Sequence, residues 1–237
     1  MGDRGKTYRR WRRLSPLIVT AGLILALYQS WLRVPANLAP WGDVDLEQQP
    51  GLLARFQINS LAADSGACLA ALDRSDLVYR MTPARPIIAG CGFVNVVHPT
   101  RSHIAYNRSF DLTCGMMAGL YWYEARLQEL AQAHLGGTIT EIDQLGTYAC
   151  RNINGATSGR RSQHATANAI DIAAFHLADG RTVSIAKDWD KDTPQGRFLA
   201  AARDEACNFF NVVLSPNYNA LHANHFHLDL GGFRMCR

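Results

Sequence analysis

The sequence has no Cys-x-x-Cys pair, no internal repeat and no low-complexity block. The missing Cys-x-x-Cys spacing argues against a cysteine zinc knuckle and against a thioredoxin-like redox motif. Charge is also scarce, at 19% of residues, whereas hydrophobic residues make up 48%. A chain of 237 residues with this balance is expected to form a globular domain with a substantial core, and not a disordered segment.

The excess of basic over acidic charge is confined to one short segment. The formal net charge is +4, but a cluster of cations lies at the N-terminus and is opposed there only by Asp3. Without this cluster the chain is close to neutral, so we expect no nucleic-acid partner. The cations are Arg4, Lys6, Arg9, Arg10, Arg12 and Arg13.

The longest apolar stretch follows this cluster. Residues 14–32, "LSPLIVTAGLILALYQSWL", have the length of a membrane-spanning helix. Cations before the stretch and none comparable after it predict a cytoplasmic segment at 1–13 and export of the remainder. We therefore expect a single-pass protein of the inner (cytoplasmic) membrane with a periplasmic domain. A cleaved signal peptide is the alternative, but bulky residues occupy the positions where its cleavage site requires small ones.

The rest of the chain is expected to form a linker and one domain. Residues 33–55 are rich in proline and lack periodicity, which predicts a linker, and 56–237 would then be the domain. Periodicity predicts helices at 58–75, 112–137 and 194–214, and strands at 91–99, 137–151 and 224–230. A hairpin is expected across 168–186, with its turn at Asp179-Gly180. This pattern indicates an α+β domain, a small antiparallel sheet with flanking helices.

All six cysteines lie after the apolar stretch, and an even number in an exported domain favours disulfides. Sequence alone permits many connectivities. Our preferred pairing is Cys68–Cys91, Cys150–Cys207 and Cys114–Cys236.

Histidines concentrate near the C-terminus. "HANHFH" contains His222, His225 and His227, and the last two would project from the same face of a strand. In "SQHATANAIDI", His164 precedes Asp171 by seven positions. These two residues and one C-terminal histidine would supply three zinc ligands and leave a fourth position open. The neighbouring histidine would then remain for proton transfer.

These motifs resemble those of a known superfamily. S-x-H-x6-D followed by a C-terminal H-x-H is similar to the signature of the lysostaphin and D-Ala-D-Ala metallopeptidases, whose fold is shared with hedgehog signalling domains. Further segments, including "GTYACR", "SQHATANAIDIAAFHLADG" and "HANHFHLDL", resemble the bacterial extensin-like C-terminal domain family over about 60–237. The expected fold is therefore hedgehog- or D-Ala-D-Ala-peptidase-like.

The resemblance implies roles for particular residues. One zinc ion would be held by His164, Asp171 and His227, with His225 as the catalytic histidine and His222 as an additional active-site histidine. Arg151 would bind a substrate carboxylate, and Arg161 and Ser162 would lie at the entrance, with Arg160 beside them. Two of these residues have structural alternatives, because Arg151 could form a surface salt bridge and Ser162 could cap a loop.

The sequence departs from the family pattern at two positions. Ala167 stands where many relatives have glycine, and Asn224 stands where the D,D-dipeptidase branch has a catalytic glutamate. We expect a zinc-dependent peptidase that cleaves peptidoglycan stem peptides or cross-links. The alternative is a non-catalytic zinc-binding module that recognises cell-wall or partner peptides, since a fold does not fix a function.

Overall fold

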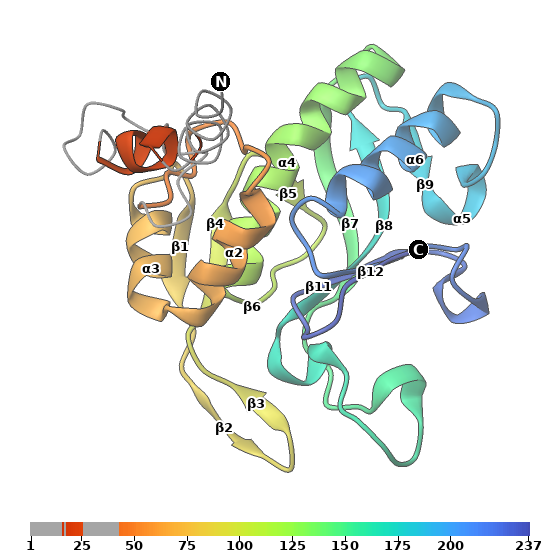
Figure 1. Ribbon diagram of the computed structural model, residues 1–237. Coiled ribbons are helices and arrows are strands. Elements are labelled where there is room, and N and C mark those ends of the chain that lie inside the picture. Colours follow the sequence, from red (N-terminus) through yellow and green to blue (C-terminus); the bar gives the residue numbers. More distant parts are fainter. Residues whose placement is uncertain (1–15, 17, 26–42) are drawn as a thin grey trace, which may run out of the picture.

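The computed structural model describes residues 16, 18–25 and 43–237, and Figure 1 shows their arrangement around the long helix α4 (Cys114–Leu135). The cytoplasmic segment predicted at 1–13 and most of the transmembrane helix predicted at 14–32 lie outside these residues. Within the described part of the chain, no helix is long and apolar enough to cross a membrane.

The described part of the predicted linker packs on the domain. Val44 and Leu46 are buried in the core. The indole Nε1 of Trp122 donates to the carbonyl oxygens of Leu46 and Gln48, at 3.0 and 3.1 Å. These contacts hold residues 44–48, which lie within the predicted linker at 33–55, against α4.

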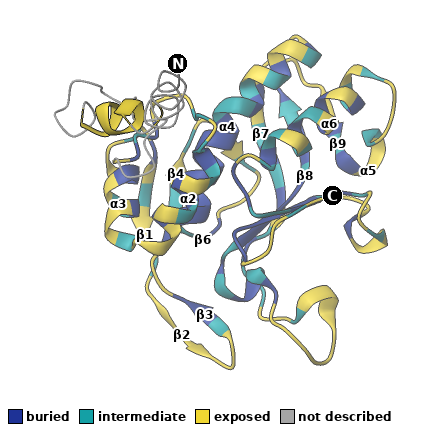
Figure 2. Ribbon diagram, in the orientation of Figure 1, coloured by how far each residue is buried: buried dark blue, intermediate teal, exposed yellow. Residues whose placement is uncertain are grey.

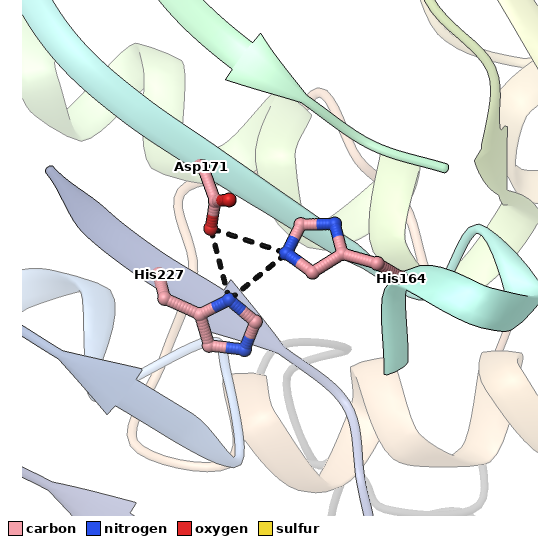
Figure 3. Close-up of side chains that lie close together, drawn as sticks. All are labelled: His164, Asp171 and His227. Atoms are coloured by element: carbon pink, nitrogen blue, oxygen red, sulfur yellow. Dashed lines mark hydrogen bonds and ion pairs between the residues drawn. The ribbon is translucent and has the colours of Figure 1, made fainter. Parts of the chain in front are cut away.

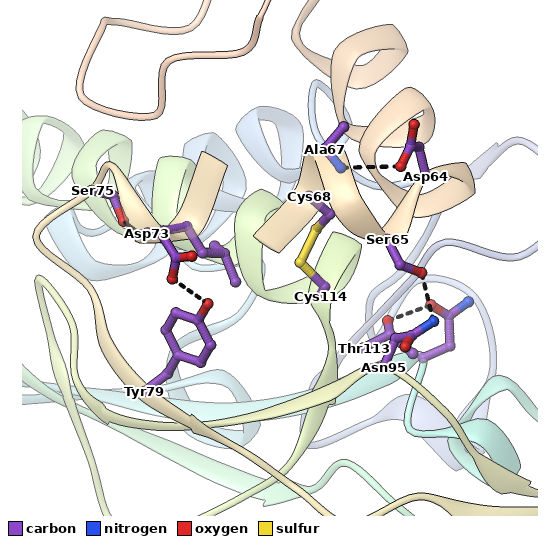
Figure 4. Close-up of a disulfide and its surroundings, with 12 residues drawn as sticks. Asp64, Ser65, Ala67, Cys68, Asp73, Ser75, Tyr79, Asn95, Thr113 and Cys114 are labelled. Carbon is purple, nitrogen blue, oxygen red and sulfur yellow. Dashed lines mark hydrogen bonds between the residues drawn. A yellow bond between two sulfur atoms is a disulfide. The ribbon is translucent and has the colours of Figure 1, made fainter. Parts of the chain in front are cut away.

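Two helices replace the single helix predicted at 58–75. They are α2 (Ala54–Ala63) and α3 (Ser65–Asp73). Asp64 has an extended backbone, and its carboxylate accepts a hydrogen bond from the backbone N–H of Ala67 at 3.0 Å (Figure 4). Because aspartate is a strong N-cap, Asp64 starts a new helix instead of continuing the first one.

The helix predicted at 112–137 is confirmed as α4, which ends at Gly136 in the left-handed conformation that C-caps require. Its aromatic residues Tyr121, Trp122 and Tyr123 are buried in the core, as expected of packing residues. Near its start, a Cβ on Gly115 would lie 2.6 Å from the Cβ of Ala62, so glycine permits the close approach of α2 and α4.

The main sheet has seven strands in the order β12–β10–β11–β8–β7–β5, with β9 paired to β8. Most pairs are antiparallel, but β5–β7 and β10–β12 are parallel. The strands are β5 (Ala105–Tyr106), β7 (Ile139–Gly146), β8 (Ala169–Leu177), β9 (Thr182–Ser184), β10 (Val212–Leu214), β11 (Phe226–Asp229) and β12 (Met235–Cys236). The predicted hairpin is confirmed as β8–β9, and the predicted final strand as β11.

Two smaller sheets complete the domain. One has the order β1 (Val78–Met81), β4 (Val96–Arg101) and β6 (Leu112–Thr113), and the other is the hairpin of β2 (Arg85–Ile88) and β3 (Cys91–Phe93). The strand predicted at 91–99 is thus divided between β3 and β4, because Asn95 has a positive φ of 53° between them. These small, mostly antiparallel sheets confirm the α+β class.

One face of the main sheet forms the core, and the opposite face carries polar residues. Ile170 and Ile172 of β8 are buried in the hydrophobic cluster, as are Phe226 and Leu228 of β11. Helix α6 (Pro194–Ala206) packs on this side, where its Phe198 meets Phe175 of β8 edge-on. The helix predicted at 194–214 ends early, and β10 follows it. Figure 2 shows the buried residues gathered along α4 and the central strands.

All six cysteines are paired, but all three predicted pairings were wrong. The disulfides are Cys68–Cys114, Cys91–Cys150 and Cys207–Cys236. Cys68 on α3 meets the first residue of α4 (Figure 4), whereas Cys91 lies on the β2–β3 hairpin, which extends away from α3 (Figure 1). Strand β12 pairs with β10, which follows Cys207 by a few residues in the chain. This pairing brings Cys236 close to Cys207. Chain topology and not sequence spacing therefore decides the partners.

A buried carboxyl group lies between α4 and the segment that leads to β5. Glu124 is fully buried and accepts hydrogen bonds from the hydroxyls of Ser102 and Tyr106 and from the backbone N–H of Ile104. Burial outweighs these hydrogen bonds and raises the pKa of Glu124 to about 7. Ionisation of this group therefore opposes folding.

We expect the stability of the protein to fall between pH 4.5 and pH 7 through this group. The pKa of Glu124 is higher in the folded state than in the unfolded state. The group therefore contributes its full stabilisation when the pH is below its pKa in the unfolded state. That stabilisation is lost as the pH rises through its pKa in the folded state. Across this window, the free energy of unfolding of the wild type, measured with urea, should fall by about 3 kcal/mol relative to that of Glu124→Gln. The matched control is Glu129→Gln, which alters an exposed glutamate on the same helix. Parallel pH profiles for wild type and Glu124→Gln would contradict the expectation.

Candidate metal centre

His164, Asp171 and His227 meet on the polar face of the main sheet (Figure 3). Asp171 and His227 are direct partners in the β8–β11 ladder, so their side chains project side by side. His164 approaches from the short 3₁₀-helix η3 (Gln163–Thr166), which precedes β8. The predicted metal ligands are therefore brought together from three separate elements.

The three facing atoms form a small triangle. The Nε2 of His164 lies 3.2 Å from the Oδ1 of Asp171 and 3.1 Å from the Nδ1 of His227, and the third side of the triangle is 2.9 Å. Neighbouring ligands around a tetrahedral zinc ion lie about 3.3 Å apart. Since the side chains need only small shifts to reach this spacing, the triangle fits one face of a tetrahedral zinc site.

The other nitrogen of each imidazole has a hydrogen-bond acceptor. The Nδ1 of His164 lies 3.2 Å from the carbonyl oxygen of Thr147, and the Nε2 of His227 lies 2.8 Å from the Oδ2 of Asp229. Both acceptors require an N–H donor, which leaves the lone pairs of His164 Nε2 and His227 Nδ1 pointing into the triangle. Such outer partners orient metal-ligating histidines.

This set of atoms calls for a cation at its centre. His164 is only 2% exposed, and Asp171 and His227 are each 8% exposed. Together they present two nitrogen lone pairs and one carboxylate to the same point. Without a metal, a proton must fill that role. Burial opposes a charge on His227, but hydrogen bonds with Asp171 and Asp229 outweigh it and raise its pKa to about 9. Burial likewise opposes ionisation of Asp171, but the two histidines hold its pKa well below the usual range.

The segment that carries His164 is held at both ends. Ser162 caps η3 by accepting a hydrogen bond from the backbone N–H of His164 at 3.3 Å, which is the structural alternative considered for this residue. Ala167 ends η3 with a φ of 54°, in the left-handed region. This conformation favours glycine and explains why the residue type expected here from the family pattern is glycine.

The two remaining C-terminal histidines lie beside the triangle. The Nε2 of His225 is 3.6 Å from the Oδ1 of Asp171, and the imidazole centroids of His222 and His225 are 5.2 Å apart. The Nδ1 atoms of these rings face the side-chain oxygens of Asn219 and Asn224, at 2.7 and 2.8 Å, so each Nε2 keeps a lone pair. His225 does not join the three-atom set, and the predicted division between ligands and spare histidines is present in the geometry.

Burial keeps these two histidines neutral. It lowers the pKa of His222 to about 4, with help from the charges on neighbouring histidines and Arg151. Burial also lowers the pKa of His225, although Asp171 acts in the opposite direction. Both rings are therefore proton acceptors at neutral pH.

The arginines predicted to bind substrate line a pocket of about 150 Å³ next to His222 and His227. Arg161 donates to the carbonyl oxygen of Ala89 and to the Oδ1 of Asn152, and so ties the β2–β3 hairpin to this loop. The guanidinium of Arg160 lies over the ring of Phe233. The side chain of Arg151 makes no hydrogen bond or ion pair with any residue that the structure describes, so the surface salt bridge considered for it is absent among them.

Sequence reasoning missed three contributors to the site: Thr147, Asn219 and Asp229. A signal existed for Asp229, because it lies two positions after His227 on a strand and must share its face. The Oδ1 of Asp229 also accepts a hydrogen bond from the backbone N–H of Gly231 at 2.6 Å, which fixes the carboxylate. Thr147 contributes only a carbonyl oxygen, for which the sequence holds no signal.

The fold and the site define a class of protein: a disulfide-linked α+β domain with a buried candidate metal centre of two histidines and one aspartate. A family model described as "Extensin-like protein C-terminus" matches residues 66–237, and the chain belongs to this family. No curated protein and no solved structure matched the chain.

Loss of the carboxylate behind His227 is expected to weaken metal binding. Asp229→Asn removes the charge that orients the imidazole, and such outer-partner changes cost roughly 10–100-fold in affinity. Zinc titration of the full-length chain in competition with a chelating dye measures the change. Asp192→Asn, which alters an exposed aspartate, is the control and should bind zinc as tightly as the wild type. Equal affinities for Asp229→Asn and the wild type would refute the role of Asp229.

Proposed function

We propose that this protein is a zinc-dependent hydrolase, a peptidase that cleaves peptidoglycan stem peptides or cross-links. The observation that carries the proposal is the arrangement of three convergent buried ligands beside two neutral histidines. A purely structural zinc site closes with a fourth protein ligand, whereas a catalytic one keeps a position open. The resemblance of the motifs to lysostaphin and D-Ala-D-Ala metallopeptidases, with their hedgehog-like fold, belongs to the same proposal.

When bound, zinc would supply the Lewis acidity that activates water and polarises a carbonyl group. The chain itself supplies the proton acceptor. His225 directs Nε2 toward Asp171, and its Nδ1–H is held by Asn224, so the ring is oriented to take a proton at Nε2 and to return it to the leaving amine. His222, which is neutral and adjacent, can hydrogen-bond to the reacting oxygen or to His225.

The pocket beside the histidines suits a ligand with both anionic and apolar parts. Arg151 provides a guanidinium that has no partner among the described residues, and Ile153, Tyr218 and Phe233 add partly exposed apolar walls. Guanidinium groups bind carboxylates through paired, charge-assisted hydrogen bonds. The free carboxylate of a peptide terminus, next to a small apolar side chain, matches these features. Arg161 and Ser162 line the same pocket and would contact the substrate at its edge.

The proposed location follows from the disulfides and the N-terminal sequence. Three disulfides in one domain are typical of an oxidising compartment. The basic segment at 1–13 and the apolar segment at 14–32 would anchor the chain in the inner membrane with the domain in the periplasm, where peptidoglycan is accessible.

His225→Ala is expected to abolish most hydrolysis and to leave zinc binding intact. Loss of a general acid–base group costs roughly 10²–10⁴-fold in rate, whereas the three ligands are unchanged. Release of peptide fragments from peptidoglycan sacculi by the zinc-loaded full-length chain measures the rate.

His134→Ala, at the end of α4, is the matched control and should behave as wild type. If wild type and His225→Ala both bind zinc and both leave sacculi intact, the peptidase proposal fails and the peptide-recognition alternative is favoured.

Arg151→Ala is expected to reduce kcat/KM for peptides with a free terminal carboxylate. A charge-assisted hydrogen bond is worth about 1.5–3 kcal/mol, which corresponds to roughly a 10–100-fold loss. The same peptide with an amidated terminus should be cleaved equally by wild type and variant. Arg197→Ala is the control, because Arg197 pairs with Asp192 on the surface. An equal loss on both peptides would show that Arg151 does not select the carboxylate.

A further inference from the structure

We propose that Glu141, Asp143 and His176 form a second divalent-cation site, separate from the centre at His164. The two acidic residues lie on β7, and His176 lies on β8. No residue is shared with the first centre, so this proposal does not depend on the proposed peptidase activity.

The three side chains converge through the ladder of β7 and β8. Glu141 is the direct partner of His176, and Asp143 is the partner of Ala174, two residues before His176. The Nε2 of His176 lies 2.9 Å from the Oδ2 of Asp143. One ligand atom from each of the three residues lies within 4.8 Å of the others.

The two sites are too far apart to share an ion. His176 lies five positions after Asp171 on the same strand, and a strand advances by about 3.3 Å per residue, which separates the two residues by roughly 16 Å along β8. A second ion would therefore bind independently at the other end of β8.

The charges around this cluster favour a cation. Asp143 has His176 as its ion-pair partner, and Glu141 has no ion pair with any described residue. The nearest charged residue after the hairpin turn, Arg181, is paired with Asp179. Two carboxylates and one imidazole are thus close together, and neither carboxylate has an ion pair with a lysine or arginine among the described residues. A bound cation would add positive charge between them.

His176 is also oriented as a ligand. Its Nδ1 lies 3.1 Å from the hydroxyl oxygen of Thr182 on β9, so an N–H at Nδ1 can donate to that hydroxyl and leave the Nε2 lone pair for an ion. The side chains of His176 and Asp143 are 34% and 33% exposed, and water has room to complete the coordination. One imidazole and two carboxylates suit Zn²⁺ or Mn²⁺, and this partly solvated site should bind more weakly than the buried one.

Zinc titration of the full-length chain by calorimetry tests the second site. Wild type should bind two zinc ions, one tightly and one weakly. His176→Ala and Asp143→Asn should each lose the weak event and keep the tight one. His164→Ala should lose the tight event and keep the weak one, which separates a failure of this proposal from a failure of the proposed function.

His98→Ala is the matched control. His98 also pairs with one aspartate, Asp111, at 3.0 Å, but it belongs to no three-residue cluster in the described part of the chain. This variant should still bind two ions. A wild type that shows no binding event sensitive to both His176→Ala and Asp143→Asn would overturn the proposal, whether it binds one ion or two.

Discussion

The direct pairing of Asp171 with His227 across β8 and β11 is the contact on which the candidate site depends. It places a carboxylate and an imidazole on the polar face of the sheet at a fixed spacing, while their neighbours in sequence enter the core. Burial of such groups without a compensating charge costs several kcal/mol. The site therefore needs a positive charge, which a proton on His227 or a bound metal ion can supply. The outer hydrogen bonds from His164 to Thr147 and from His227 to Asp229 orient the two imidazoles.

The rest of the domain keeps this pairing rigid. Helices α4 and α6 cover the opposite face of the sheet, and the disulfides connect the pieces that the core alone would hold weakly. Cys91–Cys150 ties the β2–β3 hairpin to the segment before η3, and Cys207–Cys236 joins the end of α6 to the edge strand beside β10. Cys150 directly precedes Arg151, so the Cys91–Cys150 disulfide ties the loop that carries this arginine to the β2–β3 hairpin.

The sequence indicated which three residues would lie together at the candidate site, but it missed several details of the fold around them. Alternation along β8 and β11 separates apolar from polar residues, and so the faces of Asp171 and His227 could be assigned without coordinates. Local signals also identified α4 and the β8–β9 hairpin. Disulfide partners could not be inferred, because they depend on where the hairpin at Cys91 and the strand at Cys236 come to lie. The break at Asp64 was missed because helix propensity averaged over many residues hides the effect of a single strong N-cap. The packing of Val44 and Leu46 was missed because it depends on tertiary burial, which local sequence patterns do not report.

The most direct test is to locate zinc in crystals of the zinc-loaded protein by anomalous diffraction. We expect an ion between the Nε2 of His164, the Oδ1 of Asp171 and the Nδ1 of His227, with no fourth protein ligand. An empty position between these three atoms would contradict the metal centre. Coordination by His225 as a fourth ligand would contradict the catalytic interpretation and leave a structural zinc site in its place.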